Sequence, residues 1–307
     1  MSNPTDIVLS LSFVAAISLF LISALLRWVF ALRKQAVAAP PPVADDASWQ
    51  GDEMPISEPT QTSFPYGKVP VWFYRRVDLL GIGLVFLMFG GLALSAVQKP
   101  YNPSTSLSPM DLVVNIVFQF ILAGMVTLIV SWRVTPMLWL GLRWPSWLWV
   151  FLIAPGSVIF MSVFSYGLQC SGYMEWMKSF DVETVQDTVK VLQKSGDPLV
   201  LGLMALAATI AAPICEEIVF RGYFYPAMKK FAGVWPAAVA SSLIFGLAHG
   251  NLTALLPLFV FGLLLVFVYE KTGSLWAPVA VHFCFNGATV LIQFVARYFN
   301  ISLDSVP

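Results

Sequence analysis

Charged residues are scarce in this chain, and their scarcity indicates its class. Of 307 residues, 11% are charged and 58% are hydrophobic, whereas soluble domains average about 25% charged and 45–50% apolar residues. A water-soluble fold is therefore not expected. The 17 basic and 17 acidic residues balance each other, so no excess charge indicates a nucleic-acid partner.

Cysteine and histidine are also rare. The three cysteines, Cys170, Cys215 and Cys284, form no CxxC pair, so neither a zinc knuckle nor a disulfide framework is indicated. We expect free, mostly buried thiols. The two histidines of the chain are His249 and His282, and both lie in apolar segments.

Long apolar runs are what the chain has instead. A membrane-spanning helix needs about 20 mainly apolar residues, because lipid offers no partner for an unpaired backbone group. The sequence therefore predicts an all-α, polytopic bundle of about eight transmembrane helices. These cover residues 7–26, 77–97, 112–132, 147–167, 198–220, 234–249, 253–269 and 276–294.

The placement of positive charge predicts the orientation. Asp6 precedes the first span, whereas Arg27, Arg33 and Lys34 follow it, which by the positive-inside rule puts the amino terminus outside. With the loops alternating sides, 12 of the 17 Lys and Arg residues fall in cytoplasmic segments. We expect an integral multi-pass protein, in the cytoplasmic membrane if the source is bacterial.

The composition divides the chain into five parts. Residues 35–75 are rich in Pro and acidic residues and are predicted to be a disordered cytoplasmic linker. Residues 171–197 carry an amphipathic pattern that is typical of a helix on the outer surface or one that caps the bundle. The parts are a first transmembrane helix (1–34), the linker (35–75), transmembrane helices 2–4 with the outer loop (76–197), an apolar carboxyl-terminal core (198–296) and a tail (297–307).

Two adjacent glutamates in an apolar segment are the first candidates for chemistry. Placing one ionisable side chain at membrane depth costs about 2.5–3.5 kcal/mol, so Glu216 and Glu217 need compensation or a function. Glu217 and Arg221 are four residues apart, in the favourable order for a helical ion pair. Taken alone, the pattern fits equally an anchor at a helix end.

The histidines extend this set. His282 and Asn286 share one helical face, and Phe245 and His249 repeat that spacing one hairpin earlier. An acid, two imidazoles and an amide can activate water and stabilise an oxyanion. To bring His249 to the depth of Glu216, we expect its helix to begin after Pro236 and to continue past Gly250.

Three motifs together resemble those of one family. They are Glu-Glu-x-x-x-Arg at 216–221, Phe-x-x-x-His at 245–249 and His-x-x-x-Asn at 282–286. It is the CPBP family of CAAX-processing and bacteriocin-processing intramembrane endopeptidases, also called the Abi family. The likeness covers about residues 198–295. Three motifs in this order, each in an apolar helix, are specific.

The resemblance implies a role for each site residue. Glu216 would be the general base and His249 would help it to hold the attacking water, while His282 and Asn286 would face the oxyanion. Glu217, Arg221 and Phe245 would support them. We favour a mechanism without a cofactor, although Glu216, His249 and His282 would also make an acceptable zinc site.

Other functions stay open at the level of the sequence. Buried Glu and His also serve ion-coupled transporters, and a non-catalytic scaffold or immunity protein could use the same fold. The favoured hypothesis is an intramembrane endopeptidase. Its partners would be the lipid bilayer and a membrane protein or peptide substrate.

Overall fold

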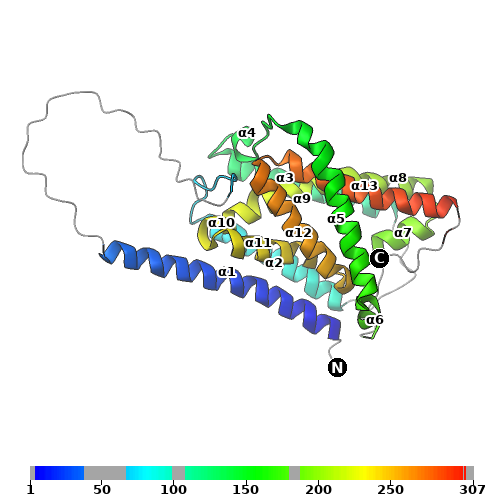
Figure 1. Cartoon of the computed structure of the whole chain (residues 1–307), viewed down its shortest axis with the longest axis horizontal. Helices are drawn as coiled ribbons and strands as arrows, with labels where there is room; N and C mark the ends of the chain where they lie inside the picture. The colour runs from blue at the N-terminus through cyan, green and yellow to red at the C-terminus, as the bar shows by residue number, and fades with distance from the viewer. Residues whose placement is uncertain (1–3, 38–66, 99–107, 180–186, 300, 302–307) are drawn as a thin grey trace, which may run out of the picture.

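The computed structural model describes residues 4–37, 67–98, 108–179, 187–299 and 301, and this part of the chain is helical without a β-strand (Figure 1). The predicted all-α fold class is confirmed. The long helices are α1 (Pro4–Val37), α2 (Asp78–Gln98), α3 (Pro109–Ser131), α5 (Val150–Cys170), α12 (Leu252–Thr272) and α13 (Trp276–Tyr298). The shorter ones include α4 (Pro136–Trp139), η1 (Trp147–Trp149), α6 (Tyr173–Lys178), α7 (Asp187–Lys194) and α11 (Val234–Leu247).

Six of the described helical stretches are long and apolar enough to cross a membrane. They are Ile7–Leu32, Pro109–Ser131, Trp147–Cys170, Pro198–Ala232, Leu252–Thr272 and Trp276–Tyr298. Two shorter apolar helices, Asp78–Gly91 and Val234–Leu247, occupy the other two predicted positions. The protein is thus an integral, multi-pass membrane protein, while the count of about eight spans and the outside amino terminus stay predictions.

The core lies around α12. In its most apolar window 56% of the residues are buried, against 17% in α1, α3 and α5, so these three helices lie at the outside of the bundle. α1 runs along α10 and α11 at the edge of the bundle, and α5 packs across α13 and α12 (Figure 1). The helices of the last third of the chain therefore form the interior.

The predicted linker is wrong at both of its ends. α1 continues to Val37, two residues beyond the predicted start of the linker. Residues 67–74 pack on the bundle, with Val69, Val71 and Tyr74 buried. Contacts with helices distant in sequence hold this segment, for example the hydrogen bond from Lys68 N to the Glu270 carbonyl at 3.0 Å. The part of the prediction that concerns 38–66 lies outside the described residues.

The predicted outer loop forms two short helices, α6 and α7. Leu192, on the apolar face of α7, is buried against the region of α8 and α13. The part of the predicted amphipathic pattern at residues 180–186 lies outside the described residues.

The expected start of the sixth helix after Pro236 and its expected continuation past Gly250 are both wrong. α11 begins at Val234 and ends at Leu247, and a turn follows in which Gly250 has φ +64°. Asn251 then caps α12 by accepting from Ala254 N at 2.8 Å. His249 therefore lies in the turn between two helices, because a left-handed residue and an N-cap end one helix and begin the next.

The stretch Pro198–Ala232 is continuous but not uniform. It runs through α8 (Pro198–Leu206), the π-helical η2 (Ala207–Ala211), α9 (Ala212–Glu217), the π-helical η3 (Ile218–Phe224) and α10 (Tyr225–Ala232). Pro213 and Pro226 lie just after the two π-helical turns. Proline has no N–H to donate inside a helix, so each leaves a carbonyl that needs another donor. π-helical turns of this kind are frequent at functional sites.

Candidate active site

A chain of three charged or titratable side chains joins η3 to α13. Arg221 Nη1 donates to Glu217 Oε1 at 2.9 Å, and His282 Nδ1 lies 2.9 Å from the same oxygen. All three side chains are at most 3% exposed. Because a carboxylate only accepts, Nδ1 of His282 carries the proton. Glu217 therefore orients the imidazole, a contact that the sequence did not predict.

Arg221 is held on two further sides. Its Nη2 donates to the Gly262 carbonyl of α12 at 3.2 Å, and its guanidinium carbon lies 4.3 Å from the centre of the Phe245 ring. A cation over an aromatic face is stabilised when both are desolvated. This geometry gives Phe245 a contact that fits the supporting role implied by the resemblance.

Glu216 faces the other nitrogen of the same imidazole. Its Oε2 lies 4.0 Å from His282 Nε2 and is buried with no hydrogen-bond partner, although the side chain as a whole is 24% exposed. The distance of 4.0 Å is too long for a direct hydrogen bond. Glu216 is thus an unsatisfied acceptor next to a free ring nitrogen.

His249 reaches the group from the turn after α11. Its Nδ1 lies 2.9 Å from the Phe245 carbonyl, and its ring centre lies 5.1 Å from that of Phe245. Phe245 also contacts the His282 ring, at 5.9 Å between centres. Both imidazoles therefore contact one phenyl ring, but His249 is exposed. Since Nδ1 donates to a carbonyl, Nε2 of a neutral His249 is left as an acceptor.

Asn286 is anchored to the first π-helical turn. Its Nδ2 donates to the Ala208 carbonyl at 2.9 Å. In a π-helix this carbonyl would accept from the residue five positions on, which is Pro213 and has no N–H. One of the two amide hydrogens of Asn286 thus replaces the missing backbone donor, and the other is left for a further acceptor.

The residues considered for a zinc site are not grouped around a common point in the described part of the chain. Among the described residues no three His, Cys, Asp or Glu side chains are grouped so that they could hold a metal ion. This holds for the three candidate ligands Glu216, His249 and His282. Cys215 is buried, Cys284 half-buried and Cys170 exposed, and all three are free thiols.

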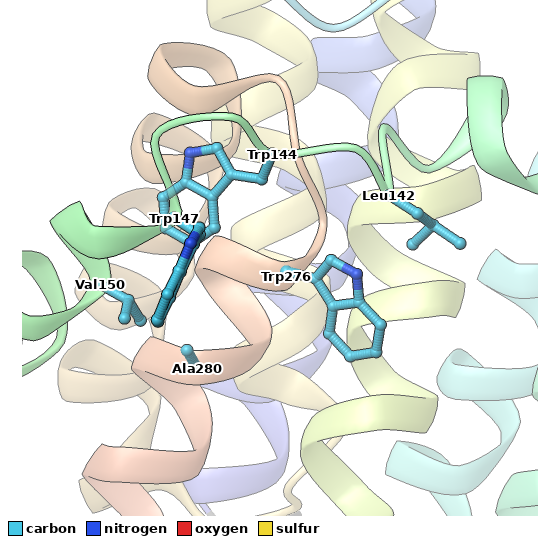
Figure 2. Close-up of a pocket in the computed structure, with 6 residues that line it drawn as sticks. All are labelled: Leu142, Trp144, Trp147, Val150, Trp276 and Ala280. Carbon is cyan, nitrogen blue, oxygen red and sulfur yellow. The ribbon is translucent and has the colours of Figure 1, made fainter.

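An apolar groove of about 330 Å³ opens near the start of α13 (Figure 2). Trp276 and Ala280 contribute from α13, six and two residues before His282, and the indoles of Trp144 and Trp147 face them from the α4–α5 connection (Figure 2). No acidic, basic or imidazole side chain lines this groove.

A second polar cluster ties the site to the amino-terminal half, and the sequence did not predict it. Asp78, 1% exposed, accepts from Arg133 Nη1 at 2.7 Å and from Tyr223 OH at 3.2 Å. It joins α2, the end of α3 and η3. An acid at the first turn of α2 and a basic residue after α3 were the available signals, but the pairing of distant helices is a tertiary contact.

Comparison with known proteins bears on this core. Residues 198–288 match the family described as type II CAAX prenyl endopeptidase Rce1-like. The chain is 30% identical over 135 residues to "Putative membrane peptidase YdiL" of Bacillus subtilis (strain 168), covering 44% of this chain and 53% of that one. It is 33% identical over 91 residues to "Membrane-embedded CAAX protease MroQ" of Staphylococcus aureus (strain USA300), covering 28% and 37%.

These matches agree with the resemblance predicted from the motifs, and the resemblance is thereby confirmed for this core. The chain spans about half or less of the length of these two curated relatives. No solved structure matches it.

Proposed function

We propose that this protein is an intramembrane endopeptidase that hydrolyses a peptide bond of a membrane-associated protein or peptide. The supporting observation is Glu216 Oε2, buried without a hydrogen-bond partner and 4.0 Å from His282 Nε2. A carboxylate in that state is an acceptor for a water proton. The names of the matched family and of the two relatives support the same class of reaction.

Glu216 acts as the general base in this proposal. A water held at Glu216 Oε2 attacks the carbonyl carbon of the scissile bond, and its proton passes to the carboxylate. The C–O bond forms while the carbonyl π bond becomes an oxyanion. Collapse of the oxyanion breaks the C–N bond, and the protonated Glu216 returns the proton to the leaving amine.

Three further side chains support this step. His282 and Asn286 donate to the oxyanion, and His249 accepts from the water or the substrate. With a proton on Nε2 as well as Nδ1, His282 donates to the oxyanion, and the Glu217 carboxylate at 2.9 Å compensates the positive charge. The second amide hydrogen of Asn286 is a further donor. The free Nε2 of His249 accepts from the water or from a peptide N–H of the substrate.

The test of this function is a comparison of cells that express the unmodified protein with cells that express Glu216→Ala at equal level. Mass spectrometry of membrane peptides is expected to show cleavage products that the variant lacks, and these identify the substrate. The matched control is Glu175→Ala, because Glu175 is exposed on α6. Identical profiles from all three would favour a scaffold, and Glu216-dependent ion flux in vesicles would favour a transporter.

Removal of metal ions is expected to leave the activity unchanged. The candidate ligands Glu216, His249 and His282 do not form a metal-binding group among the described residues, and Glu216 has a role without a metal. Peptide cleavage is measured before and after dialysis against a strong chelator, together with the zinc content of the purified protein. Stoichiometric zinc that is lost together with activity would contradict the expectation.

A further inference from the structure

The second π-helical turn, η3, follows Glu217 directly and contains Arg221. Gly222 lies within it, and Pro226 lies four residues further on. Because proline has no N–H, the Gly222 carbonyl lacks the donor that a regular helix would provide. A buried carbonyl without a donor is strongly disfavoured, so where the π-helical turn returns to the α-helix of α10, a donor from outside the helix stabilises the Gly222 carbonyl.

Two side chains from distant parts of the chain supply it. Tyr74 OH donates to the Gly222 carbonyl at 2.6 Å, and Trp139 Nε1 lies 2.7 Å from the same oxygen and 3.0 Å from Tyr74 OH. A carbonyl oxygen has two lone pairs and can accept from both. Tyr74 is 2% and Trp139 1% exposed, so water does not replace them easily.

The side chains of Trp139 and Leu140 also lie close to the Cα of Gly222. A Cβ at this position would lie 2.9 Å from Leu140 Cδ2 and 3.5 Å from Trp139 Cζ2. Glycine thus lets the indole-bearing helix α4 reach the backbone of η3.

Tyr74 itself belongs to a segment that is fixed at its other end. Lys229 Nζ, on α10, donates to the Val69 carbonyl at 3.0 Å and to Glu270 Oε1 at 2.5 Å. Desolvation by burial raises the pKa of the Tyr74 phenol well above its ordinary value. The phenol is therefore protonated at any physiological pH and is available as a donor.

We propose that Tyr74 and Trp139 are positioning residues of the candidate active site, acting through the Gly222 carbonyl. They hold the π-helical register of η3, and so fix where Arg221 and Glu217 meet His282. A change of register by one residue rotates the flanking helix by about 100°. Such a rotation would separate Glu217 from the imidazole that it orients. This inference rests on the proposed endopeptidase function.

The test uses Tyr74→Phe, Trp139→Phe and the double variant in the full chain, reconstituted in lipid nanodiscs. The substrate is a fluorogenic peptide, taken from a set with and without a prenylated CAAX end, that the unmodified protein cleaves. Each single variant keeps one donor, so its kcat is expected to fall by no more than about threefold. The double variant is expected to lose about 10²-fold in kcat, with KM little changed.

Hydrogen exchange provides a measurement that does not depend on catalysis. Backbone exchange over residues 218–226 is expected to become faster in the double variant and to stay unchanged in each single variant. Tyr173→Phe is the matched control, because it removes another phenol-to-carbonyl bond, the one from Tyr173 OH to Thr253 O at 3.1 Å. This control is expected to change neither kcat nor exchange in η3.

The outcomes separate the two proposals. If the unmodified protein cleaves no peptide, the proposed function fails, while the exchange measurement still tests the register. If it cleaves and the double variant keeps its kcat or its slow exchange, the positioning role is contradicted. Should the double variant not accumulate, adding Pro226→Ala supplies an N–H four residues after Gly222. Recovery of a folded protein is then expected, and its failure would contradict the proposal.

Discussion

Glu216→Gln is expected to lower kcat for peptide cleavage by about 10²–10⁴-fold, the range in which general acid–base groups contribute. The substitution keeps the volume of the side chain but removes the carboxylate that takes the water proton. Because Glu216 makes no hydrogen bond through Oε2 and is 24% exposed, the fold is expected to survive. The measurement is kcat in nanodiscs together with the melting temperature of each protein.

The comparison variants make this result specific. Glu175→Gln changes an exposed glutamate on α6 and is expected to retain full activity. His282→Ala and His249→Ala are expected to abolish cleavage as Glu216→Ala does, and the exposed His249 is the one that should leave the melting temperature unchanged. Full activity of purified Glu216→Gln would refute the assignment of the base.

Arg221→Met is expected to be the most destabilising single substitution in the core, by about 3–5 kcal/mol. It leaves the Glu217 carboxylate, which is 0% exposed, without its cation. It also removes the hydrogen bond to the Gly262 carbonyl and the contact with the Phe245 ring. Thermal or denaturant unfolding of the detergent-solubilised protein measures the effect.

A double-mutant cycle decides whether the loss comes from the unpaired carboxylate. Glu217→Gln combined with Arg221→Met is expected to be less destabilising than Arg221→Met alone, because no buried charge is then left without a partner. Arg143→Met, at an exposed position, is expected to change the free energy of unfolding by less than about 0.5 kcal/mol. Additive effects of the two core substitutions would contradict this account.

The parts of the fold that depend on local pattern could be predicted from the sequence. Apolar runs of about 20 residues indicate membrane helices directly, and the Glu217–Arg221 pair follows from helical spacing. The end of α11 could also be predicted from the sequence, because glycine is common just after a helix and asparagine is common as the N-cap of the next one. The predicted longer helix, which would place His249 at the depth of Glu216 in the membrane, is inconsistent with these two residues.

The contacts that depend on distant segments could not be predicted in this way. Nothing in the composition of residues 67–75 shows that Lys229 and Glu270 will hold them, so the Pro-rich pattern before them was extended too far. The bond between Glu217 and His282 likewise needs two helices placed side by side. Pro213 and Pro226 did carry information, since each proline inside a helix requires that a carbonyl find a new donor.

The two donors to the Gly222 carbonyl limit how much of the chain can be removed from the core. Tyr74 and Trp139 both precede the segment 198–288 that matches the peptidase family, as do Asp78 and Arg133. An excised fragment with every recognised motif would still lack the groups that complete its backbone hydrogen bonding. The stretch that matches the peptidase family is therefore shorter than the stretch whose hydrogen bonds complete the site.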